Sequence, residues 1–253
     1  MNTPKALHLY ALSTLPEIRP GDNLARLIAA AIHREGVTVQ ENAVLVAAQK
    51  IVSKAEGAVV DLRTIIPSKR ALSFAKAHNK DPRFIELVLD QSKQLFRVER
   101  GIIIAKTHHG FVCANAGVDR SNVPGKEQAT LLPRNPDRSA VRLREGLRGL
   151  LGINISVVIS DSFGRPWRRG QVNVALGVAG FRAIENVHGK YDREGQPLVA
   201  TQSATADEIA AAGGLLMAKQ AGHPVVFLAG LHLDLIEGTA QELLRDSEQD
   251  LFR

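Results

Sequence analysis

Five short apolar runs constrain most strongly how this 253-residue chain can fold. Each is rich in Val, Ile, Leu or Ala and is shorter than a typical helix, a pattern typical of buried strands. Aromatic residues make up only 4% of the chain, so these aliphatic runs must supply much of the core. The runs are Ala43–Ala48, Ile102–Lys106, Ile153–Ser160, Val172–Val178 and Pro224–Ala229.

Helical patterns alternate with these runs, but not as a strict βαβ series. Apolar residues at helical spacing predict helices over residues 23–35, 68–78, 82–96, 139–151 and 207–219, and a charged helix in the tail. Asp22 is the expected N-cap of the first helix, and Gly36 suits its end. The other expected elements are strands near 7–11 and 111–115, a turn and strand within 53–62, and two strands around a turn at 190–196. The fold predicted is α+β, with mixed sheets and packed helices in one domain over residues 1–253.

Composition excludes several classes of function. The net charge of +6 suits an anionic ligand, but the basic residues are dispersed, which argues against a nucleic-acid partner. The one cysteine, Cys113, excludes an internal disulfide and a multi-cysteine metal site, and its surroundings predict a buried strand residue. The chain shows no signal-peptide pattern and no window near the roughly 18 apolar residues of a membrane span. We therefore expect a cytoplasmic protein without a membrane partner.

Several familiar catalytic motifs are missing from the sequence. GxxxxGK(S/T) and GxGxxG are both absent, which argues against a P-loop and against a Rossmann dinucleotide site. HExxH, GxSxG and an EF-hand loop are absent too. The adjacent pair His108 and His109 fits a turn better than a metal site.

Two acidic residues remain as candidates for chemistry, because each follows a predicted strand. Asp161 comes after the apolar run VVIS, and Asp119 comes after VCANAGV. Carboxylates at strand ends face the crevice where ligands enter α/β sheets, and Mg²⁺ prefers carboxylate, hydroxyl and phosphate oxygens. Asp119, Asp161 and Ser162 therefore suit a metal site. Each Asp equally suits a turn cap or a partner for a nearby arginine.

The stretch ISDSFGRPWRRG at 159–170 adds positive charge beside Asp161, in what we expect to be a loop. Arg165, Arg168 and Arg169 carry planar groups that match carboxylate or phosphate oxygens, which favours a ligand over a merely solvated loop. Lys50 and Lys54 follow another core strand and could contact phosphate, although each taken singly fits a surface lysine better.

Taken together, these segments resemble one family, the coenzyme F420:L-glutamate ligases. The resemblance runs through nearly the whole chain in the family's order. It implies a mixed α+β fold of two intertwined subdomains, a homodimer, and use of GTP with Mg²⁺ or Mn²⁺, helped by K⁺. No appended reductase domain of the kind found in some members is expected. The matching stretches are LPEIRPGDNLA at 15–25, QKIVSKAEG at 49–57, NAGVDRSNV at 115–123, ISDSFGRPWRRG at 159–170, NVALGVAGF at 173–181 and ADEIAAAGGLLM at 206–217.

The resemblance also implies roles for individual residues. Asp119 and Asp161 match the carboxylates of a first divalent metal, and Ser162 matches a ligand of a second. The nucleotide contacts implied are Leu15, Pro16, Glu17, Ile18, Gln49, Lys50, Lys54, Asn122, Met217, Ala218, Lys219, Gln220, Ala221, Gly222 and His223. Gln220 matches a metal-binding Gln only if a gap is placed, because MAKQAGHP is one residue shorter than the family pattern and lacks the Gly after Met.

The activity implied is GTP-dependent addition of L-glutamate to the F420 precursor through an acyl phosphate. In this reaction the three arginines would hold an anionic substrate, either the phosphodiester of the coenzyme or the carboxylates of glutamate. Two alternatives stay open: a ligase of the same family with another acid acceptor, such as a pterin, and a non-catalytic nucleotide-binding homologue. Retention of Asp119, Asp161 and Ser162 together favours an enzyme.

Overall fold

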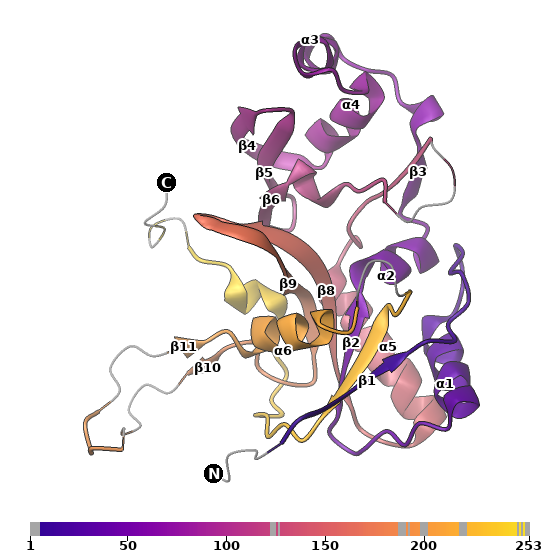
Figure 1. Cartoon of the computed structure of the whole chain (residues 1–253), viewed down its shortest axis with the longest axis vertical. Coiled ribbons are helices and arrows are strands. Elements are labelled where there is room, and N and C mark those ends of the chain that lie inside the picture. Colours follow the sequence, from indigo (N-terminus) through magenta and orange to yellow (C-terminus); the bar gives the residue numbers. More distant parts are fainter. Residues whose placement is uncertain are drawn as a thin grey trace.

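The computed structural model describes residues 6–121, 125, 127–186, 191, 193–197, 202–217, 222–246, 248 and 250. These residues form two lobes, one above the other in Figure 1. The larger lobe is built around a five-stranded sheet, and the smaller lobe comes from the part of the chain between α2 (Gln49–Ala55) and α5 (Pro136–Leu151). The predicted α+β class with mixed sheets is confirmed.

The five strands of the large sheet come from distant parts of the chain. β2 and β8 pair in parallel, from Val44 opposite Ser156 to Ala48 opposite Ser160, while all other neighbours are antiparallel. The two strands therefore run toward the same edge of the sheet. The strand order is β1 (His8–Leu12), β12 (Val225–Ala229), β2 (Val44–Ala48), β8 (Ser156–Arg165) and β9 (Arg168–Ala179).

Helices cover both faces of this sheet (Figure 1). α1 (Leu24–Glu35) and α5 pack on one face, and α6 (Thr205–Gly214) packs on the other. Alternation along β2 explains the two layers: Leu45 and Ala47 point into the first core, whereas Val44 and Val46 point into the second. Across the ranges described, no helix is both long and apolar enough to cross a membrane.

The small lobe has its own core, made by two helices packed beside a three-stranded sheet. Its fully buried side chains include Leu62, Ile85, Val88 and Ile103. Its elements are β3 (Val59–Asp61), α3 (Lys69–His78), α4 (Pro82–Asp90), β4 (Ser92–Glu99), β5 (Ile102–Thr107), β6 (Val112–Ala114) and β7 (Gln128–Thr130).

Short elements complete the described chain. Outside the small lobe, β10 and β11 form a two-stranded ribbon that projects from the large lobe in Figure 1. They span Glu185–Asn186 and Gln202–Ser203. Three 3-10 turns lie at Leu62–Thr64, Asn115–Gly117 and Ala240–Leu243.

An apolar cluster joins the two lobes. Phe111 from the β5–β6 turn packs with Leu132 and Leu176, and all three are buried. The ring of Phe111 meets that of Phe163 on β8 edge-on, at a centroid distance of 6.5 Å. This contact holds the tip of the β5–β6 hairpin against the large sheet, so the two lobes have a defined position relative to each other.

The structure corrects two expected helix boundaries. The predicted helix over 82–96 is wrong beyond Asp90, because residues 92–99 form β4 and pair with β5. The N-cap of α1 is Asn23, whose side chain accepts a hydrogen bond from the Arg26 amide, and Asp22 instead accepts one from the Arg19 amide. The end of α1 at Gly36, in a left-handed conformation, is confirmed.

Other expectations were wrong because long-range pairing overrides local pattern. Of the turn and strand expected within 53–62, the strand is confirmed as β3, but residues 53–55 belong to helix α2 rather than to a turn. The stretch 159–170 forms the paired ends of β8 and β9 rather than a loop. The helix expected over 207–219 spans Thr205–Gly214. In the described part of the tail, the 3-10 turn takes the place of the expected charged helix.

The start of α5 packs closely against β9 at Gly177, and a substitution there tests how tight this packing is. A Cβ atom there would lie 2.3 Å from the carbonyl oxygen of Pro136 at the start of α5. We expect Gly177→Ala to lower the free energy of unfolding by about 2 kcal/mol or more, because backbone must move to admit the methyl group. Chemical denaturation followed by circular dichroism measures the change.

Gly149, exposed within the same helix, provides the matched control. A Cβ atom at this position would meet nothing within 4 Å. Gly149→Ala should therefore leave the protein as stable or raise its stability by up to about 1 kcal/mol through helix propensity. Equal stability of both variants would contradict the close approach.

Candidate functional site

A cavity of about 950 Å³ lies between the two lobes. The small lobe supplies one wall, from Cys113 to Ser121. The large lobe supplies the segment before α1, the start of α2, the outer parts of β8 and β9, and the residues before β12. The site is thus built from both lobes.

The cavity gathers most of the residues predicted for nucleotide and metal binding. The ones lining it are Leu15, Pro16, Glu17, Ile18, Gln49, Lys50, Lys54, Asp119, Asp161, Ser162, Met217, Gly222 and His223. Arg165, Arg168 and Arg169 do not line it. The remaining predicted residues lie outside those that the structure describes: Asn122, Ala218, Lys219, Gln220 and Ala221.

The parallel pairing of β2 and β8 explains why two of these segments meet. α2 begins at Gln49, directly after β2, so Gln49 and Lys50 stand beside Ser160 at the end of the paired region. β8 continues past this point, and its pairing with β9 shifts register between Ile159 and Ser160. Such a β-bulge redirects side chains and is frequent next to functional sites. Asp161 therefore lies within an extended strand rather than after it.

Lys50 contacts the loop that carries Asp119. Its ammonium lies 2.7 Å from Asp119 Oδ2, 2.6 Å from the carbonyl oxygen of Ser121 and 2.9 Å from Ser121 Oγ. The Ser121 amide donates to Asp119 Oδ1 at 2.7 Å, and its hydroxyl donates to Oδ2 at 2.7 Å. Burial alone would raise the pKa of Asp119, but the hydrogen bonds from Lys50 and Ser121 outweigh burial and lower it. Asp119 is therefore held as a carboxylate.

The backbone around Asp119 is held firmly. Its amide and carbonyl both pair with Thr130, at 3.0 and 2.8 Å. Just before it, Asn115, Ala116 and Gly117 all have left-handed backbone conformations, which are strained for the first two. The Asn115 side chain accepts a hydrogen bond from the Ile103 amide, which ties this turn to β5.

A second ion pair, between Lys54 and Glu17, also lines the cavity. Lys54 is only 7% exposed, and its ammonium lies 2.5 Å from Glu17 Oε1. The pair joins α2 to the segment before α1. A buried lysine needs such a partner, because an isolated buried ammonium is strongly disfavoured.

Ser121 and Asn173 are among the lining residues that the sequence analysis missed. Ser121 bridges Asp119 and Lys50, and its position two residues after an Asp is a pattern typical of an Asx turn. Asn173 on β9 accepts a hydrogen bond from the Ser162 hydroxyl at 2.8 Å. No local pattern distinguishes Asn173, because its role depends on the pairing of β8 with β9.

Cys113 lines the cavity but is unsuited to nucleophilic chemistry. It is buried, as the sequence predicted. Burial, with a further contribution from the charge of Asp161, raises the pKa of the thiol to about 12. The thiolate, which is the reactive form, is therefore scarce at neutral pH.

The oxygen atoms along the cavity wall suit a hard divalent cation. Asp119 and Asp161 contribute carboxylates, and Ser162 contributes a hydroxyl. Within the described ranges, no group of three or more His, Cys, Asp or Glu side chains is arranged to hold a metal alone. Mg²⁺ commonly binds through one or two carboxylates together with substrate phosphates, so the residues present fit a metal that is bound jointly with a phosphate ligand.

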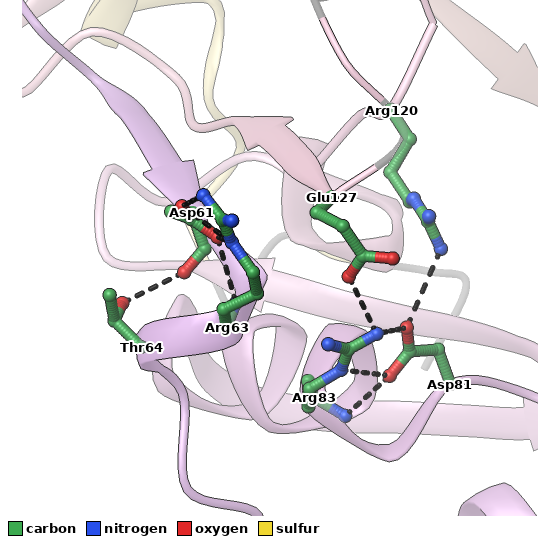
Figure 2. A network of polar contacts seen from close by, with 7 residues as sticks. All are labelled: Asp61, Arg63, Thr64, Asp81, Arg83, Arg120 and Glu127. Atoms are coloured by element: carbon green, nitrogen blue, oxygen red, sulfur yellow. Dashed lines mark hydrogen bonds and ion pairs between the residues drawn. The ribbon is translucent and has the colours of Figure 1, made fainter.

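A network of ion pairs anchors the segment after Asp119 to the small lobe (Figure 2). Arg83 Nη2 lies 2.8 Å from both Asp81 Oδ2 and Glu127 Oε2. Arg120, next to Asp119, reaches the same Asp81 oxygen at 3.8 Å. Asp81 also caps α4 through the Arg83 amide. The start of α4 therefore holds both ends of the segment 120–127.

Fold and site together define an α+β protein with a cleft between two lobes, in which lysines and carboxylates face one another. The model of the family described as F420-0:Gamma-glutamyl ligase matches residues 13–230. The chain therefore belongs to the F420-0:gamma-glutamyl ligase family.

Curated relatives cover nearly the whole chain. The coenzyme F420:L-glutamate ligase of Methanothermobacter thermautotrophicus is 41% identical over 251 residues, which cover 98% of this chain and 99% of the relative. The proteins of the same name from Methanocaldococcus jannaschii and Methanopyrus kandleri are 39% and 41% identical over 242 residues each, with 94% of both chains covered.

Asp81 should make stability depend on pH. The hydrogen bond from Arg83 lowers the pKa of Asp81 in the folded protein. Its contribution is therefore present above the unfolded pKa of about 4 and is lost as pH falls through the folded value. Asp81→Asn keeps a good N-cap but removes the charge, so we expect a loss of about 1 kcal/mol at pH 7 that shrinks toward pH 3. Urea denaturation across this range measures it.

Asp90, at the other end of α4, is the matched control, because its pKa is shifted in the opposite direction from that of Asp81. Burial, followed by the charge of Glu86, raises the pKa of Asp90. A carboxylate with a raised folded pKa destabilises the folded state at neutral pH and is relieved as pH falls. Asp90→Asn should therefore be neutral or stabilising at pH 7. A loss of stability in Asp90→Asn as large as that in Asp81→Asn would refute the assignment.

Proposed function

We propose that this chain is a GTP- and divalent-metal-dependent ligase that joins L-glutamate to the precursor of the deazaflavin coenzyme F420. The observation that carries the proposal is the convergence of Asp119, Asp161, Ser162, Lys50 and Lys54 on one cavity, in a chain that belongs to this ligase family over residues 13–230. Relatives named for the same reaction align over nearly their full length, which supports transfer of the activity.

The proposed reaction has two steps. The terminal carboxylate of the acceptor attacks the γ-phosphorus of GTP, and GDP leaves as the acyl phosphate forms. The amine of glutamate then attacks the acyl carbon, phosphate leaves, the amine nitrogen loses its proton, and an amide bond remains. Positioning and neutralisation of phosphate charge supply most of the acceleration in phosphoryl transfer. In this proposal, Lys50 and Lys54 would supply the cationic contacts to the nucleotide.

Asp119 and Asp161 would hold a first Mg²⁺ or Mn²⁺, and Ser162 would contribute to a second. When bound, such ions neutralise charge on the β- and γ-phosphates. The chain's own contribution is rigidity, because the backbone pairing with Thr130 and the β8–β9 ladder fix these oxygens before a ligand binds. Gln220, outside the described residues, remains proposed as a further ligand, as does K⁺ as an activator.

The outer half of the β8–β9 hairpin carries the three arginines beyond Gly164 and Gln171, which line the cavity. Arg165 Nη2 donates to the carbonyl oxygen of Arg169 at 2.9 Å, and Arg168 and Arg169 are exposed. We propose that this half of the hairpin holds the anionic part of a substrate that extends out of the cavity. A homodimer is also proposed, and Trp167 at the hairpin tip, 81% exposed, offers an apolar contact for it.

A direct assay tests the activity. Purified protein with the F420 precursor, L-glutamate, GTP and Mn²⁺ should give a product heavier by one or more glutamyl units, as measured by mass spectrometry. We expect Asp161→Asn to lower kcat by about 100-fold or more, because removal of a charge-stabilising group from phosphoryl or acyl transfer typically has effects of this size.

Asp246, in the described part of the tail and away from the cavity lining, is a suitable control. Asp246→Asn should retain full activity. Folded wild-type protein that binds GTP but forms no glutamyl product would favour a nucleotide-binding homologue, and product from another acid acceptor alone would favour a different ligase.

Substitution of the arginines should change the KM of one substrate without changing that of GTP. Arg168→Ala and Arg169→Ala should raise the KM of the F420 precursor or of glutamate by about tenfold, because a hydrogen bond between charged groups contributes roughly 1.5–3 kcal/mol. The KM of GTP should stay unchanged. Arg142→Ala, exposed on α5, should alter none of the three constants. Unchanged KM values in Arg165→Ala, Arg168→Ala and Arg169→Ala alike would dispose of this role.

A further inference from the structure

Lys50 occupies a set of oxygen atoms that would also suit a divalent cation. The three oxygens around its ammonium are a carboxylate, a carbonyl and a hydroxyl, at 2.6–2.9 Å. An ammonium has three hydrogens to donate, so these contacts use all of them. Oxygen ligands of these same kinds are the ones that Mg²⁺ and Mn²⁺ prefer.

The acceptors are fixed, whereas Lys50 is able to move. Asp119 is held by its backbone pairing with Thr130 and by the Ser121 amide on Oδ1, neither of which involves Lys50. Lys50 reaches these atoms from the second position of α2 through four methylene groups, and its side chain is 18% exposed and lines the cavity. Withdrawal of the lysine would therefore leave the oxygens in place.

A lysine ammonium and a divalent metal cannot share Asp119 Oδ2 at contact distance. The two positive charges would repel each other by several kcal/mol at a separation of about 4 Å, at an effective dielectric constant near 20. A metal that takes Asp119 Oδ2 therefore displaces Lys50 from that oxygen. The displaced ammonium remains in a cavity proposed to hold phosphate groups, which are the anions best able to replace the carboxylate.

We propose that Lys50 is an exchangeable counter-ion of the metal site. Before the metal binds, Lys50 neutralises Asp119 and donates to Ser121; when the metal takes Asp119, Lys50 transfers to the phosphates of the nucleotide. The phosphate half of this exchange rests on the proposed function, whereas the metal half does not. Metal and nucleotide then assist each other's binding. The metal frees Lys50 to contact the phosphates, and the phosphates accept the ammonium that the metal displaces from Asp119.

Metal binding in the absence of nucleotide is the first test. Mn²⁺ binding to Lys50→Gln, followed by the paramagnetic resonance signal of free Mn²⁺, should be tighter than to the wild type by about tenfold or more, since a competing charge has been removed. Lys50→Arg keeps the charge and should stay close to the wild type. GTP binding to Lys50→Gln without metal, measured by calorimetry, should be weaker. A merely structural lysine would not move the two affinities in opposite directions.

Lys54 is the matched control for charge alone. It lines the same cavity and follows Lys50 by one helical turn, but it pairs with Glu17. Lys54→Gln removes the same charge and should strengthen Mn²⁺ binding much less than Lys50→Gln does. Equal strengthening in both variants, or none in folded Lys50→Gln, would overturn the exchange.

A measurement on the unaltered protein avoids any folding defect of the variants. Brief acylation followed by peptide mass spectrometry reports the reactivity of each lysine amine. Saturating Mn²⁺ should raise the reactivity of Lys50 and leave that of Lys54 unchanged, and addition of GTP should protect Lys50 again. No response of Lys50 to Mn²⁺ would overturn the proposal. A response to Mn²⁺ with no GTP binding would instead contradict the proposed nucleotide.

Discussion

The parallel pairing of β2 with β8 determines where a ligand can bind in this protein. It is the one parallel contact within the large sheet, and it brings the ends of two buried strands to the same edge. One strand turns at once into α2 and presents Lys50 and Lys54, while the other continues through a bulge and presents Asp161 and Ser162. Opposite charges are thereby delivered to one edge by backbone geometry, the arrangement expected where parallel strands end.

The small lobe completes this half-built site with Asp119. The loop that carries Asp119 is fastened at its start by three left-handed residues and by Thr130, and beyond Asp119 by Asp81 and Arg83. The ion pair between Lys50 and Asp119 crosses from one lobe to the other. Neither lobe alone therefore contains the constellation, and the apolar contact between Phe111 and Phe163 keeps the two halves at a constant distance.

The sequence pattern predicted those helices and strands whose ends depend on nearby residues. Gly36 ends α1 through a left-handed backbone conformation, and the stretches Val44–Ala48 and Val157–Ile159 are uniformly apolar because both faces of the sheet are covered. Residues 92–96 were assigned to a helix because their spacing also fits a helical face, and only pairing with β5 makes them a strand. The polar stretch beyond Ser160 looked like a loop for the same reason, since its partner, β9, is visible only in the fold.

The same distinction applies to the candidate site. Asp119, Asp161 and Ser162 attract notice because carboxylates and hydroxyls after apolar strands are chemically conspicuous, and resemblance to one family added the nucleotide residues. Ser121 and Asn173 escaped notice because their contacts depend on a turn geometry and on a strand pairing. The three arginines suggested a binding loop, yet the hairpin carries them past the cavity lining. Residue type thus predicted that the carboxylates and Ser162 line the cavity, but it did not predict the position of the arginines.

The paired charges of the cleft bear on how it can accept a highly charged ligand. Lys50 is neutralised by Asp119 and Lys54 by Glu17, so neither lysine faces the cavity as an uncompensated charge. An unpaired buried ammonium would be strongly disfavoured, whereas an exchange of one partner for another conserves the number of close ion pairs. A polyanion that arrives with its divalent cations is itself nearly neutral, so it can enter with little change in net charge. Under the proposed function, the cleft would therefore suit a metal–nucleotide complex better than either component alone.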